Sequence, residues 1–109
     1  MNIRFEYLYR DYGNFKRWGV IIFSNPNRIG VDRVVSKAEE VLIDGLYFLA
    51  SKASLPDLHF EKYIDHLGHG WHEFHSFENT DQTPTDPHNR RIEEFLDSLC
   101  LGAILFFGL

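Results

Sequence analysis

The first 23 residues alternate between apolar and polar positions in a way that predicts two β-strands. From residue 3 to residue 10, the odd positions fall on one face of an extended chain and the even positions fall on the other. The odd face carries Ile3, Phe5, Tyr7 and Tyr9, and the even face carries Arg4, Glu6, Leu8 and Arg10. Gly13 and Asn14 tolerate positive φ and supply a turn, and a second apolar run covers about residues 15–23. We therefore predict a β-hairpin at the start of the chain.

The spacing of apolar residues changes to that of a helix between about residues 31 and 43. The apolar stripe consists of Val34, Val35, Ala38, Val41 and Leu42. Asn27 or Asp32 is the candidate N-cap. Asp44 and Gly45 mark the end of the helix, because Gly45 is able to adopt the left-handed conformation. The pattern predicts an amphipathic helix with one buried face.

Three further segments have the apolar content or the alternation of strands. Residues 46–50 are apolar and aromatic, which favours a short strand over a continuation of the helix. Residues 58–64 alternate weakly, and we expect another strand or an irregular edge there. Residues 71–77 alternate again and predict a strand that follows Gly68 and Gly70.

Residues 78–86 are polar and predict a loop before a second helix. Asp86 suits the N-cap of that helix, and Pro87 suits its first position. The apolar stripe of the helix contains Ile92, Phe95, Leu96 and Leu99. An uncharged tail then covers residues 99–109, which is shorter than the roughly 20 residues that a membrane span requires. We expect this tail to be a buried strand or helix end, a docking patch for another subunit or partner, or a weak membrane-surface contact.

Together these elements predict a single α+β domain over residues 1–109, with the element order ββαβ(β)βα. We expect an antiparallel sheet of four or five strands with two helices on one face. A chain of 109 residues suits one domain, and an apolar fraction of 44% is enough for its core. Because antiparallel sheets tolerate one solvated face, the alternating strands leave the other face partly polar.

Charge and cysteine content narrow the classes of function. The chain has 11 basic and 16 acidic residues, a net charge of −5, and the acidic residues are concentrated after residue 40. Nucleic-acid binding needs a basic footprint, so the sequence argues against it. Cys100 has no second cysteine for an intrachain disulfide, and the N-terminal residues lack an apolar signal core. We therefore expect a cytoplasmic protein without a membrane span.

The most distinctive chemical feature is a run of histidines at every third position, His66, His69, His72 and His75. Imidazole is the commonest transition-metal ligand, and its charge changes near neutral pH. On one strand His72 points to one face and His75 to the other, so a strand alone would split the cluster. A loop folded back at the glycines before Trp71 is needed to bring His66 or His69 beside the other histidines. The sequence has no His-Glu-x-x-His pair and no cysteine ligand set.

Three interpretations of the histidine run remain open. The histidines are polar residues of a sheet edge and a glycine-rich loop, or they bind a divalent transition metal such as zinc, nickel, copper or iron. A hydrolase that uses Glu73 as general base is the sharper form of the metal hypothesis. In the third interpretation the histidines act without metal, in acid–base catalysis or as a pH switch.

The hairpin combines basic and aromatic residues and offers a second candidate site. Arginine beside aromatic rings binds anions or bases by ion pairing and stacking. The candidate anion-binding residues are Arg4, Arg10, Arg17 and Trp18. An anionic small molecule such as a nucleotide fragment, or an acidic protein patch, fits better than a long polyanion, which the acidic second half would repel. The alternative is a solvated sheet face with cross-strand ion pairs, such as Glu6 with an arginine.

Three runs of the sequence resemble a family of small bacterial proteins of unknown function. They are FEYLYRDYGN at residues 5–14, PDLHFEK at residues 56–62 and WHEF at residues 71–74. The resemblance extends to about residue 98, and it implies a bacterial soluble protein without indicating an activity, a cofactor or site residues. The apolar end after Leu99 departs from the pattern.

The sequence completes no catalytic constellation, because the Gly-x-Ser-x-Gly and phosphate-binding glycine motifs are absent. We therefore expect first a non-enzymatic binding or accessory protein. Such a protein would self-associate as a homodimer, through the apolar tail or an edge strand, or bind a protein partner. A metal-binding protein that uses the histidine run is one alternative, and an anion or nucleotide-fragment binder that uses the hairpin is the other.

Overall fold

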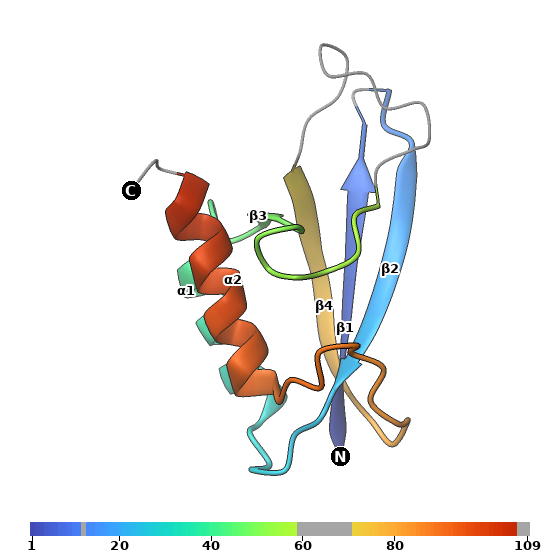
Figure 1. The fold of residues 1–109 in the computed structure, drawn as a ribbon, viewed down its shortest axis with the longest axis vertical. Helices are drawn as coiled ribbons and strands as arrows, with labels where there is room; N and C mark the ends of the chain where they lie inside the picture. The colour runs from blue at the N-terminus through green and yellow to red at the C-terminus, as the bar shows by residue number, and fades with distance from the viewer. Residues whose placement is uncertain (12, 59–70, 107–109) are drawn as a thin grey trace.

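The computed structural model describes the backbone of residues 1–11, 13–58 and 71–106, and the side chains of these residues up to Cys100. Within them, four strands and two helices follow the order ββαββα (Figure 1). The elements are β1 (Asn2–Arg10), β2 (Lys16–Phe23), α1 (Val31–Val41), β3 (Tyr47–Leu49), β4 (Trp71–Thr80) and α2 (Ile92–Phe106). The strands form one antiparallel sheet in the order β2-β1-β4-β3. This arrangement confirms the predicted α+β fold.

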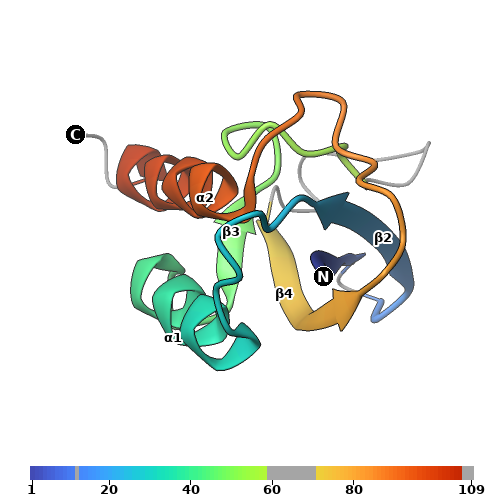
Figure 2. The same ribbon diagram turned by 90° about the horizontal axis from the view of Figure 1, so that it is seen from below.

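The predicted hairpin is formed by β1 and β2, which pair from Ile3 opposite Phe23 to Arg10 opposite Lys16. Asn14 adopts a positive φ of 66° in the turn, as its residue type suggests. The odd-numbered apolar residues of β1 are all buried, as predicted, and Leu8 on the other face is buried as well. Both helices lie on the same side of the curled sheet (Figure 2).

An aromatic cluster centred on Phe5 joins the sheet to α2. The centroid of the Phe5 ring lies 4.9 Å from those of Phe77 and Phe95, and 6.1 Å from that of Phe48. Phe23 stacks on Phe95 with the ring centroids 4.1 Å apart. These rings come from all four strands and from α2, and such pairs each contribute about 0.5–1.5 kcal/mol beyond the burial of their area. The cluster therefore fixes α2 against the sheet.

The start of α1 differs from the prediction, because neither Asn27 nor Asp32 caps the helix. Gly30 is the N-cap residue and no side chain bonds there. The side chain of Asn27 instead donates a hydrogen bond to Glu93 on α2. The end of the helix agrees with the prediction, since α1 ends at Val41 and Gly45 follows with a positive φ of 68°.

The start of α2 also differs from the prediction. Asp86 and Pro87 were expected to begin this helix, but it begins at Ile92. The carboxylate of Asp86 accepts hydrogen bonds from the backbone and side chain of Arg90, so it closes a turn before the helix. Glu94 caps the start of the helix, because its carboxylate accepts a hydrogen bond from the backbone N–H of Arg91 at 3.0 Å.

Other boundaries differ in smaller ways. Residues 78–80 were expected in a loop, but β4 continues through them because Thr80 pairs with Asn2 of β1. Leu58 lies outside any strand, and the rest of the expected 58–64 strand lies outside the described residues. The backbone of the apolar tail continues α2 as far as Phe106. Among the described residues, no helix is long and apolar enough to cross a membrane.

Arg90 and Asp86 form a buried ion pair in the segment between β4 and α2, with exposed side-chain fractions of 10% and 1%. The guanidinium donates two hydrogen bonds to the carboxylate, at 2.9 and 3.0 Å. It also donates to the carbonyl oxygens of Ala53 and Ser54, at 2.6 and 2.9 Å, and lies 5.5 Å from the centroid of the Phe23 ring. Arg90 therefore ties the segment after β3 and the segment before α2 to the core.

Replacing Arg90 with methionine is expected to lower the free energy of unfolding by about 3–5 kcal/mol, because Asp86 would remain buried without its partner. Urea unfolding followed by circular dichroism measures this loss. A loss below about 1 kcal/mol, the range of an exposed ion pair, would contradict the structural role given to Arg90.

The ion pair also predicts a pH dependence. Burial raises the pKa of Asp86, but the hydrogen bonds and charge of Arg90 outweigh burial and hold that pKa below its usual value. The folded chain therefore binds the proton less readily than the unfolded chain. The stabilisation that ionised Asp86 contributes is complete above the ordinary carboxyl pKa of about 3.9. It is lost as the pH falls through the lower pKa that Asp86 has in the folded chain.

We expect Asp86→Asn to be less stable than the wild type at neutral pH. We also expect it to lose less unfolding free energy than the wild type when the pH is lowered from about 5 to about 2. Urea unfolding of both proteins across this range tests the expectation. Parallel acid profiles for the two proteins would show that Asp86 does not carry this dependence.

Candidate functional site

The outer face of the sheet, which faces away from the helices, carries charged residues of β1 and β4. Arg4 pairs with Glu6 at 2.9 Å and reaches Glu78 at 3.9 Å. Arg10 donates two hydrogen bonds to the carboxylate of Glu73, at 2.9 and 3.3 Å. Two of the arginines predicted to bind anions are therefore paired with carboxylates of this chain.

The four candidate anion-binding residues do not converge on one point. Arg4 and Arg10 lie six positions apart on β1, which corresponds to about 20 Å along a strand. Trp18 lies on the same face of the sheet as these arginines, whereas Arg17, one residue earlier on β2, lies on the other face. Anion binding by this set stays a prediction.

His75 lies on the outer face beside Trp18, next to a bulge in β4. The pairing of β4 with β1 shifts register between Glu6 and Tyr7, next to His75. The His75 and Trp18 rings meet edge to face with their centroids 4.9 Å apart, and His75 Nε2 lies 3.5 Å from Glu6 Oε1. Half of the His75 side chain remains exposed to solvent. His75 therefore belongs to the exposed surface around Trp18.

His72 lies on the opposite face of β4, where its side chain is 1% exposed. Its Nε2 accepts a hydrogen bond from the backbone N–H of Leu58 at 3.0 Å, which is the arrangement of a neutral imidazole. The ring centroid lies 6.0 Å from that of Tyr7 and 5.3 Å from that of Tyr9. Asp57 Oδ1 lies 3.6 Å from the same nitrogen. His72 therefore holds the segment before residue 59 against the sheet.

Tyr7 supports the same segment. Its hydroxyl donates a hydrogen bond to the carbonyl oxygen of Pro56 at 2.7 Å. Burial raises the pKa of Tyr7 to about 12, and the charge of Asp57 acts in the same direction, so the hydroxyl keeps its proton at neutral pH. Gly19 on the neighbouring strand makes room for the ring, because a Cβ there would lie 2.8 Å from a ring carbon of Tyr7.

The structure does not bring His72 and His75 together, since they lie on opposite faces of β4 as expected for one strand. His66 and His69 lie outside the described residues. Within the described part of the chain, no group of three or more His, Cys, Asp or Glu side chains is arranged to hold a metal ion. A metal centre at the histidine run stays a prediction.

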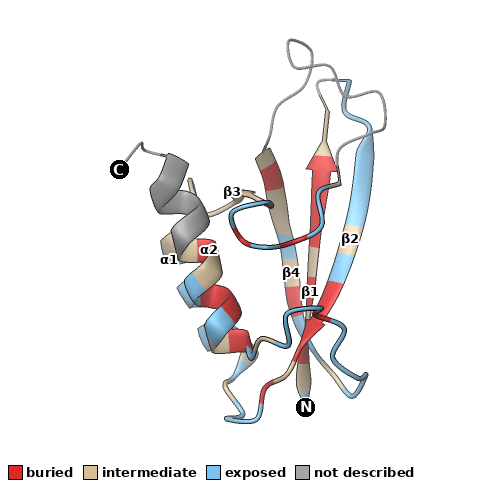
Figure 3. Cartoon of the chain, viewed as in Figure 1, coloured by how far each residue is buried: buried red, intermediate tan, exposed pale blue. Residues whose placement is uncertain are grey.

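β2 forms one edge of the sheet, and its two halves differ in exposure (Figure 3). The second half is covered by the segment before α2. Thr85 donates its backbone N–H to the carbonyl oxygen of Ile22, and its hydroxyl accepts the N–H of Ile22, both at 2.9 Å. Around the first half, Phe15, Trp18 and Val20 are 70%, 48% and 40% exposed. Within the described part of the chain, no residue bonds to the outward backbone groups of this half, and we call it the open half of β2.

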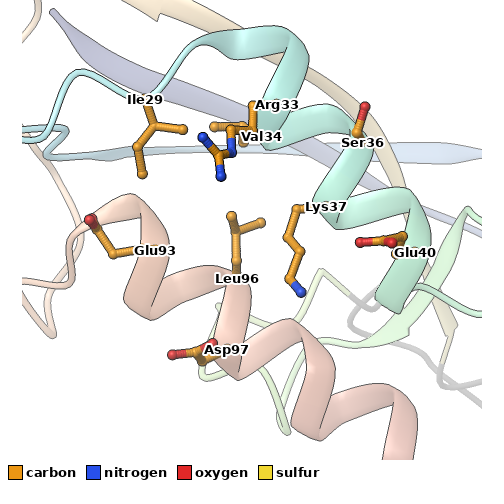
Figure 4. A pocket seen from close by; sticks show the side chains of 9 residues that line it. All are labelled: Ile29, Arg33, Val34, Ser36, Lys37, Glu40, Glu93, Leu96 and Asp97. Carbon is orange, nitrogen blue, oxygen red and sulfur yellow. The ribbon is translucent and has the colours of Figure 1, made fainter.

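A cavity of about 430 Å³ lies between α1 and α2 (Figure 4). α1 contributes Arg33 and Lys37, and α2 contributes Glu93 and Asp97. The sequence does not reveal this site, because the cavity depends on how the two helices pack. The available signal was the spacing of four residues within each pair, which places both members on one face of a helix.

No family model, curated protein or solved structure matches this chain. The exposed edge of β2 and the charged cavity between the helices are the two candidate binding surfaces among the described residues.

We expect His72→Ala to lower the free energy of unfolding by about 2–4 kcal/mol, because it leaves a cavity and removes the acceptor for Leu58. His75→Ala, the control at the exposed position, should change that energy by less than about 0.5 kcal/mol. Urea unfolding and metal analysis of the three proteins measure both effects. A His72→Ala protein of unchanged stability that had lost a stoichiometric metal would replace this structural role with a metal site.

Proposed function

We propose that this chain is a non-enzymatic binding protein that self-associates through the open half of β2, residues 16–20. The observation that carries the proposal is an open strand edge combined with exposed apolar side chains on one short segment. We further infer a reducing compartment such as the cytoplasm as its place of action, in keeping with its one cysteine.

Every second residue in this half of β2 directs its backbone N–H and C=O away from β1. Backbone groups alternate along a strand between its two sides. Ile22 directs its N–H and C=O away from β1, toward Thr85. Val20 and Trp18, two and four residues earlier, therefore direct theirs the same way. No residue in the described part of the chain bonds to these groups, and such an edge is a template for another strand.

A second copy of the chain matches this edge by antiparallel pairing about a twofold axis at Gly19. Trp18 of one copy then lies opposite Val20 of the other, and each such pair exchanges two backbone hydrogen bonds. The side chains of Trp18 and Val20 from both copies then lie on one face of the combined sheet, on either side of the axis. Arg17 lies opposite Ile21 in this register, so like charges do not face each other directly.

The proposed contact is short, so the dimer is weak. Interfaces below about 1,200 Å² belong to transient complexes. The twofold axis uses the open edge of both copies, and closed pairs do not grow into fibres. Lys16 and Arg17 at the end of the segment oppose further strand addition, since charged residues at an edge limit aggregation. A concentration-dependent dimer is therefore the expected form.

Val20→Pro is expected to abolish dimerisation and leave the fold intact. Proline removes the outward N–H of Val20, and an edge strand tolerates it because that N–H makes no bond to β1. Sedimentation velocity over a wide range of protein concentration measures the change. The wild type should show a rising sedimentation coefficient, and the variant should remain at the monomer value.

Val20→Thr is the matched control, because threonine keeps the β-branched shape and the backbone donor. This variant should dimerise like the wild type. A wild type that stays monomeric at every concentration would refute self-association through β2. A Val20→Pro protein that is folded and still dimeric would also refute it, because the contact would then lie elsewhere.

A further inference from the structure

We propose that the cavity between α1 and α2 binds a small zwitterion whose ammonium and carboxylate groups are joined by a short apolar chain. The proposal is independent of the β2 edge, because the cavity is lined by the two helices and the segment before α1. A volume of about 430 Å³ lies within the range of small-molecule sites, roughly 300–1,000 Å³.

The α1 wall of the cavity carries two basic residues and one acidic residue, whereas the α2 wall carries two acidic residues. Arg33 and Lys37, four residues apart on α1, extend toward α2 in Figure 4. Glu93 and Asp97, four residues apart on α2, form the facing wall, and Glu40 adds a third carboxylate on α1. Arg33 and Lys37 make no ion pair with any described residue, although these carboxylates line the same cavity. The walls therefore present charges that remain available to a ligand.

Glu93 supplies an independent observation. Its Oε2 accepts a hydrogen bond from the side-chain amide of Asn27 at 2.6 Å. Its Oε1 is buried and has no hydrogen-bond partner, and it is the one such side-chain atom among the described residues. No ion pair within the described residues compensates the negative charge of Glu93. An ammonium group in the cavity would supply that compensating charge.

The mixed charges of the lining disfavour ligands that carry only one charge. A plain anion attracted by Arg33 and Lys37 would meet the three carboxylates of the same cavity. A plain cation attracted by Glu93 and Asp97 would meet the two basic side chains. A zwitterion satisfies both walls at once, with its carboxylate at α1 and its ammonium at α2.

Apolar side chains separate the two charged walls. Val34 and Leu96 line the cavity between the helices, and Ile29, from the segment before α1, completes the apolar lining. Methylene groups that link the two charges of the ligand would bury apolar area against these side chains. An amino acid with its amine at the end of an aliphatic chain has this composition.

The test uses 6-aminohexanoate as the probe, with hexanoate and hexylamine as controls that each lack one charge. Amide chemical shifts of the labelled protein are followed during titration with each compound. We expect 6-aminohexanoate to shift the signals of residues around Val34 and Leu96. Its affinity should exceed that of either control by at least about fivefold, the upper range of one exposed ion pair. Equal affinity for the three compounds, or shifts located elsewhere, would overturn the proposal.

Two variants test which wall of the cavity binds the ammonium end of the ligand and which binds its carboxylate end. Glu93→Gln should weaken 6-aminohexanoate at least about fivefold and leave hexanoate unchanged, whereas Arg33→Gln should weaken both carboxylates. Lys52→Gln, at an exposed position outside the cavity lining, is the matched control and should bind like the wild type. A double-mutant cycle in the ligand-free protein supplies the last outcome. Strong coupling between Arg33 and Glu93 there would show that the walls pair directly, and it would overturn the proposal.

Discussion

The burial of one face of β1 is the constraint on which the rest of the structure depends. β1 lies inside the sheet, between β2 and β4, and its buried side chains meet rings from every other strand and from α2 at Phe5. A slip of one residue would turn Arg4 and Glu6 into this aromatic cluster, so the alternation fixes the register of both neighbouring strands. The register of β1 therefore sets the positions of β2 and β4 and of the aromatic cluster that contacts α2.

Strand alternation also decides on which face of the sheet the arginine and histidine side chains lie. Arg4 and Arg10 lie on the outer face, where carboxylates of the chain pair with them, and His75 lies on the same face beside the bulge in β4. His72 turns inward and accepts a hydrogen bond from Leu58. Groups that are close in sequence therefore act on different sides of the sheet. The open half of β2 and the cavity between the helices remain as the surfaces through which the proposed binding takes place.

The sequence was sufficient to predict the parts of this fold that depend on local periodicity. The alternation of residues 3–9 and the helical spacing after residue 31 led to the hairpin, to α1 and to the fold class. Asp86 was misassigned because its partner, Arg90, also needs the carbonyl oxygens of Ala53 and Ser54, which are distant in the sequence. A local capping pattern carries no information about such a partner.

The candidate sites were harder to predict because they depend on contacts between elements. The sequence indicated that a strand would separate His72 from His75, but it did not indicate that His72 would bond to Leu58. It placed Trp18 in the hairpin without indicating that Thr85 would cover one half of β2 and leave the other half open. The cavity between the helices arises from their packing, which neither helix encodes by itself.

Hydrogen exchange of the backbone amides of β2, measured at low and high protein concentration, tests the central claim most directly. In the proposed dimer, the outward amides of Trp18 and Val20 gain a partner, whereas the inward amides of Gly19 and Ile21 are already bonded to β1. The account predicts that exchange at Trp18 and Val20 slows as the concentration rises, while Gly19 and Ile21 remain unchanged. Exchange at Trp18 and Val20 that does not depend on concentration would contradict it.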